Sequence, residues 1–484
     1  MVVKLILEEN LVVVLGGNPK IDNYIDQATR FKASGYEHAD TYKKGEWDGF
    51  TRLYNIAEKT FPLGLLETVE MILILKDIPY ETIDNRVYRQ FSLLPITHEI
   101  ELRDYQQDAL TKAIEKQRCL LQLPTGAGKT LVGICLTAEL KLPTVFYVHK
   151  KELLYQTMRS YRKLLTFPQC KECPKYHKKK TGDCDYKKCP IGIVGDGQAD
   201  IKPITIAMIQ SAGRLPKALF SDFGIAIFDE VHHLAAQTVF DIAKDTKSKY
   251  LIGLSATVRR EDGKELMLQA GAGPISYNLS ISELIRRKFL AKPHIHAIPV
   301  APVLFSNRDN YHTVYERAIV YNTERNDNIV LKALELCDTG PVYIHVKRID
   351  HGQILVNLIN NRLLVKGLTK AIFIDGSDKT EYRNQVLDKF RHNELPILIS
   401  TLLGEGVDLP NMYGLILASG GLSRTQTIQV FGRLLRMSEH EIVIFIDVAD
   451  RCKYLYDHFL ARVNFYQSEP EFELEDYLKK LKTE

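Results

Sequence analysis

Two series of short, nearly continuous apolar runs, each separated by helical or loop segments, constrain this fold more than any other feature of the sequence. The first series lies within residues 96–285, and the second follows residue 290. The strand-sized runs are Cys119–Leu123, Thr144–Val148, Ile204–Met208, Ile225–Phe228, Tyr250–Leu254, Val342–Val346, Ala371–Ile374, Ile397–Ser400, Gly414–Ala418 and Ile442–Phe445. Apolar strands that alternate with helices are typical of parallel sheets covered on both faces. The pattern therefore predicts two α/β domains in tandem.

Residues 1–95 predict a separate, small α+β domain. Strand-like segments at Val2–Leu7 and Leu11–Leu15 precede expected helices at Ile21–Ala33 and Leu63–Lys76. The second helix is apolar on several faces, so we expect it to be buried. The predicted order is an α+β domain over 1–95, α/β domains over 96–285 and 286–466, and a charged tail over 467–484. For this tail a solvated helix or a frayed end is favoured.

Composition is that of a globular chain. Hydrophobic residues make up 45% and charged residues 26% of the sequence, which argues against disorder. No apolar run reaches the roughly 18 residues of a membrane span, and the first 15 residues lack the layout of a secretory signal. We therefore expect no membrane contact and a cytoplasmic location. The net charge of +4 neither requires nor excludes a nucleic-acid partner.

A glycine-rich turn between a predicted strand and a predicted helix favours phosphate binding. Glycines in this turn let backbone N–H groups approach a triphosphate, and the helix that begins near Lys129 adds its positive end. Lys129 is expected to reach the β- and γ-phosphates, and Thr130 to bind Mg²⁺. Leu123 stands where such loops usually have their first glycine. The candidate ATP-binding residues of the turn are Thr125, Gly126, Ala127, Gly128, Lys129 and Thr130.

An acidic pair ends the predicted strand Ile225–Phe228. Strand ends of this kind lie at the carboxyl edge of a parallel sheet, where ligands bind. Asp229 is suited to hold Mg²⁺ through water, and Glu230 to orient or deprotonate an attacking water. Because the pair lies about a hundred residues after the glycine-rich turn, it predicts ATP hydrolysis rather than a merely exposed strand end.

Residues 229–232, Asp-Glu-Val-His, resemble the DExH box of superfamily 2 helicases. The other motifs of that family occur in the family's order over residues 102–436. They are Leu102–Gln106 (the adenine-reading Q motif), His149–Leu153 (motif Ia), Ile204–Ser211 (a further strand-binding motif), Ser255–Thr257 (motif III), Thr401–Pro410 (motif V) and Gln429–Arg436 (motif VI). The resemblance implies two RecA-like domains with ATP between them.

The resemblance also implies roles at the nucleotide. Gln106 would bind the adenine edge with Arg103 nearby, and Asp408 would contact the ribose. Arg433 and Arg436 would act as arginine fingers from the second domain. A cation that arrives only on domain closure stabilises charge on the transferred phosphoryl group and couples hydrolysis to motion.

Further roles connect ATP to DNA. The residues implied to couple the two are His232, Ser255, Thr257 and Gln429, with ordinary turn or cap hydroxyls as the alternative for Ser255 and Thr257. The residues implied to contact DNA are Trp47, Lys150, Gln210, Arg260 and Thr401.

Two stretches indicate the branch of the superfamily. Ser255–Gly263 resembles the segment after motif III in XPB-like and UvsW-like DNA helicases, and its Arg260 is either part of the XPB-type Arg-Glu-Asp motif or a surface charge. Lys44–Gly49 and Phe61–Leu65 resemble the N-terminal domain of UvsW-like phage branch-migration helicases. Trp47, the only tryptophan, is either a stacking platform for bases or a core or turn anchor.

The implied function is that of an ATP-dependent DNA helicase or translocase. It would unwind or branch-migrate forked and junction DNA in recombination, replication or repair, with ATP and Mg²⁺ as cofactors and branched DNA as partner. A phage-encoded chain would act in the host cytoplasm. The alternatives are an RNA helicase and the motor subunit of a larger repair or restriction complex. A nuclease is disfavoured, because the sequence offers no second carboxylate cluster with metal-site spacing.

Four of the eight cysteines cluster within an expected insertion at 168–191. Cys170, Cys173, Cys184 and Cys189 have the spacing C-x2-C-x10-C-x4-C, and four thiolates can surround Zn²⁺ as a tetrahedron. A loop with so few apolar residues needs a metal to order it. Zinc is expected, with an iron–sulfur cluster, or free or disulfide-bonded cysteines, as alternatives. Seven lysines against three acids in this stretch favour contact with phosphates over a merely solvated loop.

Overall fold

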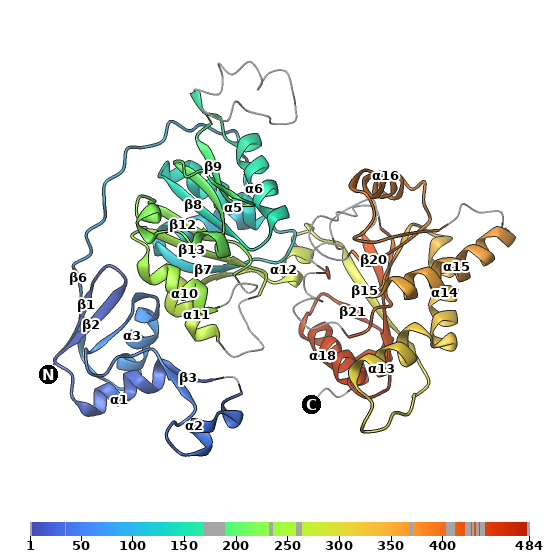
Figure 1. The fold of residues 1–484 in the computed structure, drawn as a ribbon, viewed down its shortest axis with the longest axis horizontal. Helices are drawn as coiled ribbons and strands as arrows, with labels where there is room; N and C mark the ends of the chain where they lie inside the picture. Colours follow the sequence, from blue (N-terminus) through green and yellow to red (C-terminus); the bar gives the residue numbers. More distant parts are fainter. Residues whose placement is uncertain are drawn as a thin grey trace. The chain divides into compact units, whose positions relative to one another are not determined.

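A computed structural model of the chain divides into two compact units, the first made largely of residues 1–279 and the second largely of residues 280–484 (Figure 1). The structure describes residues 2–33, 35–168, 189–231, 236–257, 264–366, 371–402, 412–421, 427, 430–431, 435 and 441–481. The described strands form two large, predominantly parallel sheets and a smaller N-terminal one. The predicted fold class, two tandem RecA-like domains after a small α+β domain, is confirmed.

The N-terminal part of the first unit is built on a four-stranded sheet in the order β5-β2-β1-β6. Its elements are β1 (Val3–Leu7), β2 (Leu11–Leu15), α1 (Pro19–Ala28), β3 (Arg30–Lys32), η1 (Tyr36–His38), α2 (Asp40–Lys43), β4 (Phe50–Arg52), β5 (Thr60–Pro62), η2 (Leu63–Leu65), α3 (Leu66–Leu75) and β6 (Tyr80–Asp84). Strands β1 and β2 pair as an antiparallel hairpin, whereas β1 and β6 are parallel. Strands β3 and β4 form a separate two-stranded sheet.

Helix α3 is less buried than its sequence predicts. Only Val69 and Leu73 lie in the core, while Met71, Ile74 and Leu75 are each more than half exposed. A helix of ten residues that rests on one layer can bury a single face, so apolar residues around its whole circumference cannot all be covered. The expectation of a buried helix was therefore wrong.

The first α/β domain carries an eight-stranded sheet in the order β10-β9-β11-β8-β12-β13-β7-β14. Its elements are α4 (Asp104–Lys116), β7 (Arg118–Gln122), α5 (Lys129–Leu140), β8 (Thr144–Val148), α6 (Lys151–Leu164), β9 (Ile191–Gly195), β10 (Gln198–Ala199), β11 (Ile204–Met208), α9 (Ile209–Ala212), η3 (Lys217–Phe220), β12 (Ile225–Phe228), α10 (Ala236–Asp245), β13 (Tyr250–Ser255), α11 (Glu265–Ala272) and β14 (Ile275–Asn278). All its described strand pairs are parallel except β9 with β10. The carboxyl ends of the central strands therefore meet at one edge.

The N-terminal domain and the first α/β domain share an apolar core. Ala270 of α11 belongs to the same buried cluster as the residues of β1, β2 and α3. The backbone of η2 approaches α11 so closely that a Cβ atom on Gly64 would overlap the carbonyl oxygen of Gln269. Asn10, at the β1–β2 turn, donates to the carbonyl oxygens of Lys244 at 2.9 Å and Thr246 at 2.7 Å. These contacts join the two domains into one unit.

The second α/β domain carries a seven-stranded sheet in the order β17-β18-β16-β19-β20-β15-β21. Its elements are α12 (Ile281–Arg286), β15 (Lys292–Pro299), α13 (Tyr311–Tyr315), η5 (Glu316–Val320), α14 (Thr323–Cys337), β16 (Val342–His345), α15 (Ile349–Lys366), β17 (Ile372–Ile374), α16 (Thr380–Arg391), β18 (Ile397–Ser400), β19 (Gly414–Leu417), β20 (Ile442–Ala449), α18 (Leu455–Ser468), β21 (Glu473–Leu474) and α19 (Asp476–Lys480). Two buried ion pairs brace it, Arg325 with Asp450 and Arg462 with Asp447.

The C-terminal segment is part of the second domain and not a solvated appendage. Strand β21 pairs in parallel with β15, and Glu475 accepts a hydrogen bond from the backbone nitrogen of Ala297 at 2.8 Å. Leu478 of α19 is fully buried. The expectation of a frayed, solvated tail was wrong, because the apolar side chains set among its charges supply a buried face.

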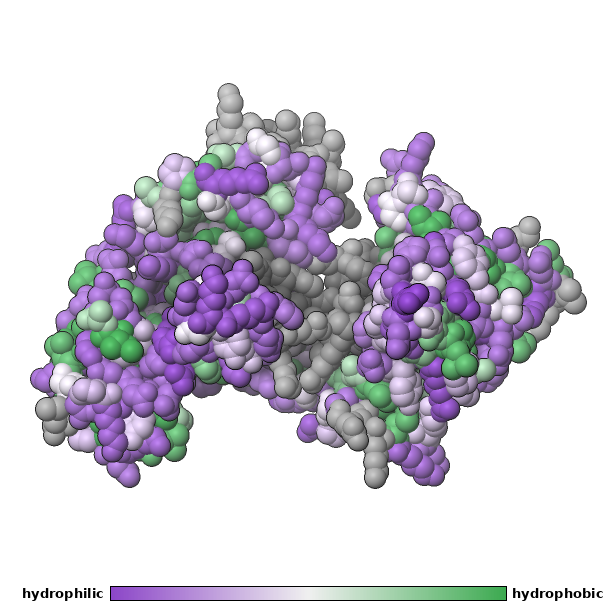
Figure 2. All heavy atoms as spheres, turned by 60° about the horizontal axis from the view of Figure 1, so that its bottom comes forward, coloured by the Kyte–Doolittle hydropathy of each residue, from purple (hydrophilic) through white to green (hydrophobic). Residues whose placement is uncertain are grey.

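Within the residues that the structure describes, no helix combines the length and the apolar character needed to cross a membrane. The face of the molecule in Figure 2 is predominantly hydrophilic, with apolar residues in small, separated patches. Scattered apolar residues of this kind are normal on a water-exposed surface.

Candidate nucleotide-binding site

The candidate residues of the first α/β domain follow one another along the carboxyl edge of its sheet. Strands β11, β8, β12, β13 and β7 are neighbours in that order. The first four strands are followed within two residues by Gln210, Lys150, Asp229 and Thr257, in the same order, and β7 is followed, after the glycine-rich turn, by Lys129. Parallel topology thus brings together motifs that are more than a hundred residues apart in the chain, as Lys129 and Thr257 are.

Lys129 begins α5, and its ammonium group is held by two oxygen atoms. Its Nζ donates to the carbonyl oxygen of Leu123 at 3.3 Å and lies 3.2 Å from Oε1 of Glu230. The side chain is only 7% exposed. Gly126 and Gly128 have φ angles of 87° and 83°, which glycine adopts without strain. The turn therefore presents a desolvated cation at a helix N-terminus, which is the arrangement that a phosphate group requires.

Gln106 of α4 connects the predicted adenine-reading motif to the glycine-rich turn. Its Nε2 donates to the carbonyl oxygen of Ala127 at 2.8 Å, and its Oε1 accepts from the backbone nitrogen of Arg103 at 3.0 Å. A Cβ atom on Gly128 would clash with the Gln106 amide. Both ends of this amide are thus engaged by the protein, and the glutamine fixes the shape of the turn.

The acidic pair lies beside Lys129. Asp229 is almost fully buried, and burial, then the neighbouring Glu230 carboxylate, raises the pKa of Asp229, while Lys129 opposes the shift. Glu230 adopts a φ of 48°, in the left-handed region that costs a non-glycine residue energy. A strained residue at the end of a buried strand is a common feature of active sites. The pair is therefore held in place at an energetic cost.

Motif III is joined to the start of the glycine-rich turn. Strand β13 pairs with β7, and the backbone nitrogen of Leu123 donates to the carbonyl oxygen of Ser255 at 2.8 Å. The hydroxyl of Ser255 donates to the carbonyl oxygen of Thr257. Ser255 and Thr257 are both buried. The Ser255 hydroxyl thus takes part in a local turn at the end of β13.

The donor set fits magnesium. Thr130 follows Lys129 in the first turn of α5, and Asp229 offers a buried carboxylate at the same edge of the sheet. Hydroxyl and carboxylate oxygens are the ligands that Mg²⁺ prefers. A buried carboxylate with a raised pKa is the kind of group that a bound cation would stabilise in its ionised form.

The candidate DNA contacts in the described residues lie at the surface. Lys150 and Gln210 are exposed at the ends of β8 and β11. Thr401 is half-buried directly after β18 of the second domain. Trp47 is half-buried, and its indole Nε1 donates to the carbonyl oxygen of Phe50 at 2.9 Å. That hydrogen bond is the one expected of a turn anchor, and the partly exposed ring leaves stacking on a base open.

Several predicted residues lie outside the described part of the chain. These are His232, Arg260, Asp408, Gln429, Arg433, Arg436, Cys170, Cys173 and Cys184. Cys189 is described; it is a buried free cysteine just before β9. Among the described residues no group of His, Cys, Asp and Glu is arranged to hold a metal ion.

Three groups that contribute to the site were not predicted from the sequence. The carbonyl oxygen of Leu123 accepts from Lys129, and the carbonyl oxygen of Tyr147 accepts from the backbone nitrogen of Asp229 at 2.9 Å. His149 lies close enough to Asp229 to influence its pKa. Backbone acceptors carry no signature in a sequence, although His149 does lie within the stretch that resembles motif Ia.

Two family matches cover the two α/β domains. Residues 99–260 match the family described as type III restriction enzyme, res subunit. Residues 327–438 match the helicase conserved C-terminal domain.

Relatives of known identity resemble the chain over most of its length. The DNA 3'-5' translocase XPB2 of Sulfurisphaera tokodaii is 28% identical over 386 residues, which are 72% of this chain and 82% of the relative. The ATP-dependent DNA helicase uvsW of Enterobacteria phage T4 is 25% identical over 437 residues, which are 84% of this chain and 82% of the relative.

A solved fragment of an HsdR subunit of a type I restriction enzyme from Vibrio vulnificus has the same fold. It superposes with a TM-score of 0.51 at 21% identity, over 78% of this chain and 69% of that one. The family matches, the relatives and the placement of Lys129, Asp229 and Glu230 show that this chain belongs to the ATP-hydrolysing helicases of superfamily 2, in the group that contains XPB and UvsW.

Proposed function

We propose that this protein is an ATP-driven DNA helicase that unwinds or branch-migrates forked and junction DNA in recombination, replication or repair. The observation that carries the proposal is the line of motif residues along one sheet edge, from Gln210 and Lys150 at the surface to Lys129 in the interior. A DNA strand bound over Gln210 and Lys150 would lie along the same sheet edge as the phosphate site at Lys129. The relatives XPB2 and uvsW are a DNA translocase and a DNA helicase, which agrees with DNA as the substrate.

The ion pair between Lys129 and Glu230 suggests how ATP binding prepares hydrolysis. The Nζ of Lys129 lies 3.2 Å from Oε1 of Glu230. The phosphates of ATP would draw Lys129 toward themselves and thereby release the Glu230 carboxylate from its partner. A released carboxylate can orient a water molecule and accept its proton as the water attacks the terminal phosphate.

Asp229 and Thr130 are the residues that would hold Mg²⁺, and the ion would neutralise charge on the phosphate oxygens. Arg433 and Arg436 would supply further positive charge from the second domain. In the proposed reaction Lys129 binds the phosphates, and Glu230 orients the attacking water and accepts its proton.

We propose that the N-terminal domain supplies the preference for branched DNA. A motor that follows one strand meets similar phosphates everywhere, so selectivity for a junction needs a second contact at a fixed position. The region around Trp47 offers basic and aromatic groups of the kind that bind nucleic acids. Arg30 lies 4.5 Å from the centre of the Phe50 ring, and Lys32 lies 4.9 Å from that of Tyr36. The shared core with α11 holds this region at a fixed position on the first motor domain.

One measurement tests the substrate. ATPase and unwinding rates of the full chain are compared on single-stranded, duplex, forked and four-way DNA and on RNA. Stimulation that is greatest with forked or four-way DNA supports the proposal. Equal or greater stimulation by RNA would identify an RNA helicase instead.

Two variants at Trp47 test the branch preference. Trp47→Phe keeps an aromatic ring but loses the hydrogen bond to Phe50, whereas Trp47→Ala loses both. If the ring stacks on a base, only the alanine variant weakens binding to junction DNA, by about 1–3 kcal/mol. Equal losses in the two variants would mean that Trp47 acts as a turn anchor alone.

We further propose that Cys170, Cys173, Cys184 and Cys189 bind one zinc ion and that the lysines between them contact phosphates. The spacing of the four cysteines and the burial of Cys189 support this. Elemental analysis of the purified chain should find one zinc per molecule, and Cys184→Ser should release it. A brown protein that contains iron would point to an iron–sulfur cluster, and a metal-free, active protein would refute both.

A further inference from the structure

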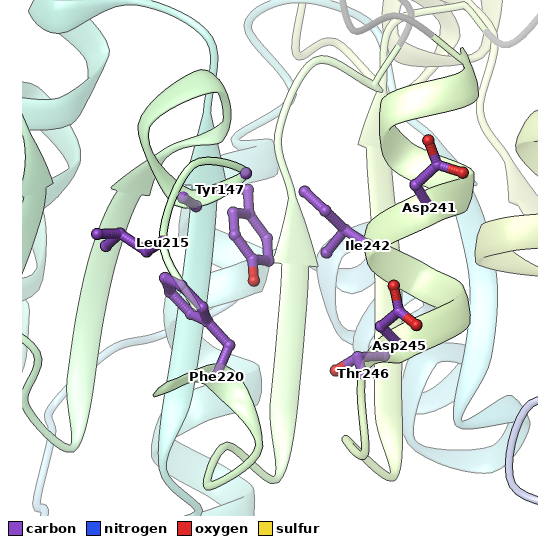
Figure 3. A pocket seen from close by; sticks show the side chains of 9 residues that line it. Tyr147, Leu215, Phe220, Asp241, Ile242, Asp245 and Thr246 are labelled. Atoms are coloured by element: carbon purple, nitrogen blue, oxygen red, sulfur yellow. The ribbon is translucent and has the colours of Figure 1, made fainter. Parts of the chain in front are cut away.

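A cavity of about 110 Å³ opens on the first α/β domain between α10 and the segment 212–220 (Figure 3). Of the residues described above for the nucleotide-binding site, the cavity includes only Tyr147, whose backbone carbonyl oxygen accepts from Asp229 while its side chain lines the cavity. The side chains and backbone that line it belong to Tyr147, Ala212, Gly213, Leu215, Phe220, Asp241, Ile242, Asp245 and Thr246. For scale, a closed apolar cavity of about 150 Å³ binds benzene, so this smaller, open cavity would hold one end of a ligand and leave the rest in solvent.

The walls of the cavity suit a flat, apolar group. The Tyr147 ring stacks on Phe228 behind it, with the ring centres 4.8 Å apart, and lies 6.2 Å from the ring centre of Phe220. In Figure 3, Ile242 points from α10 toward the Tyr147 ring, and Phe220 lies on the other side. Aromatic and branched aliphatic side chains thus face each other across a narrow space.

The hydroxyl of Tyr147 points into this space. The side chain is only 2% exposed, and its oxygen atom is directed between Phe220 and the end of α10 (Figure 3). No residue in the described ranges forms a hydrogen bond with it. A hydroxyl that faces the cavity in this way can donate to a ligand or accept a hydrogen bond from it.

Carboxylates border the same cavity. Asp241 and Asp245 lie one turn apart on α10, and both side chains are exposed to solvent. The described partner of Asp241 is the neutral amide of Gln237, which donates to its Oδ1 at 2.8 Å. The hydroxyl of Thr246 is already used, because it donates to Ser248 at 3.0 Å. The polar atoms offered to a ligand are therefore chiefly hydrogen-bond acceptors, since a tyrosine hydroxyl can accept as well as donate.

We propose that this cavity binds a planar cation on an apolar stem, namely a guanidinium or amidinium group. Such a group has donors only, in a flat fork that matches a carboxylate, and it stacks on aromatic rings. An ammonium ion is a compact, strongly hydrated charge and fits the narrow aromatic walls less well. An arginine side chain of a partner protein and a free amidino or guanidino compound share this chemistry.

Titration of the full-length chain with three probes of nearly equal size tests the charge requirement. Benzamidine is a cation, benzamide is neutral and benzoate is an anion. We expect calorimetry to show benzamidine binding at least ten-fold more tightly than benzamide, with benzoate weakest. Equal affinity for all three would overturn the proposal.

Three variants locate the binding. Asp241→Asn should weaken benzamidine binding about ten-fold, Tyr147→Phe should weaken it by a smaller factor, and Ile242→Trp should abolish it by filling the cavity. Asp388→Asn, which removes an exposed carboxylate from α16, is the matched control and should leave binding unchanged. A thermal melt of each variant confirms that it folds. Benzamidine binding that survives both Asp241→Asn and Ile242→Trp, in folded proteins, would refute the site.

A second pair of probes distinguishes the two sources. The peptide acetyl-Gly-Arg-Gly-amide is compared with the same peptide carrying citrulline, which has the shape of arginine without its charge. Binding of the arginine peptide that depends on Asp241 assigns the cavity to a partner protein. Binding of benzamidine alone, with the same dependence, assigns it to a free small molecule.

Discussion

Gln106 Nε2 and the carbonyl oxygen of Ala127 are joined by a hydrogen bond of 2.8 Å, which connects the start of α4 to the turn before α5. The other end of the same amide accepts from the backbone of Arg103. A residue expected to read the base therefore also holds the loop that receives the phosphates.

Replacing Gln106 tests this dual role. Gln106→Ala removes the support of the turn and leaves the buried carbonyl of Ala127 unpaired, so we expect the KM for ATP to rise about ten-fold. The KM for GTP should rise as well if the loop is affected, whereas a residue that only reads adenine would alter ATP alone. Gln107→Ala, at the exposed neighbouring position, is the control.

The roles of Lys129 and Glu230 are separable. Glu230→Gln should retain ATP binding, because Lys129 remains available to the phosphates, while hydrolysis falls by about 10² or more. Lys129→Ala should lose both binding and hydrolysis. Fluorescent nucleotide binding beside steady-state turnover measures the two effects. Wild-type turnover in Glu230→Gln would remove that residue as the base.

Arg433 provides a test of domain closure. If it acts only in the transition state, Arg433→Ala should keep nucleotide affinity within a few-fold while turnover falls by about 10³ or more. Arg436→Ala should behave similarly if both are arginine fingers. Parallel losses in affinity and turnover would place the arginine in the ground-state complex instead.

The second domain should be sensitive to acid through its buried histidines. Burial lowers the pKa of His345 to about 4, and it lowers that of His351 well below the usual value. The unfolded chain, with a histidine pKa near 6.5, then binds more protons than the folded chain between about pH 4 and 6.5. Stability is therefore complete above about pH 6.5 and is lost as the pH falls toward 4, by about 3 kcal/mol for His345.

Urea unfolding at a series of pH values measures this loss. His345→Gln keeps a neutral polar side chain that cannot take up a proton, so its stability should fall less between pH 7 and 4 than that of the wild type. His392→Gln, at an exposed position, should follow the wild-type profile. Identical profiles for all three proteins would show that His345 does not titrate in this way.

Gly64 controls the attachment of the N-terminal domain. A side chain at this position would overlap the carbonyl oxygen of Gln269 and lie 2.6 Å from that of Ala270. Gly64→Val should therefore destabilise the first unit by about 1–3 kcal/mol and speed proteolysis between the two domains. Gly376→Ala, where the nearest atom is 4.0 Å from the new Cβ, should have little effect. A melting temperature unchanged by Gly64→Val would mean that η2 moves aside freely.

Most of the sheet strands could be predicted because buried parallel strands are continuously apolar. Thr144–Val148 and Ile225–Phe228 have the predicted bounds. Strand β15, Lys292–Pro299, was missed because it contains prolines and histidines, and a strand near a sheet edge tolerates such residues. The short strand β21 was missed because its neighbours are charged.

The site was predictable to the extent that it consists of side chains in a known order. Lys129 and Glu230 were found in this way, and the structure places them 3.2 Å apart. Leu123 stands where a glycine is usual, yet its side chain is fully buried in the core, and its backbone serves the site through the carbonyl oxygen toward Lys129 and the nitrogen toward Ser255. Backbone contacts of this kind depend on the position of the main chain and not on the residue type, so the sequence does not reveal them. The cavity beside Tyr147 could not be predicted either, because its apolar residues resemble ordinary core and its two aspartates resemble an ordinary solvated helix face.

The apolar core shared between the N-terminal domain and α11 limits how freely this region can be exchanged as a module. Removing the N-terminal domain up to the end of β6 would expose Ala270, with Phe240 and Leu266 beside it. The first α/β domain would then carry an exposed apolar patch that favours aggregation. A chimaera that carries a different DNA-recognition domain would have to bring a matching α11 with it. In lineages of related helicases, changes at Gly64 should therefore be accompanied by changes in α11.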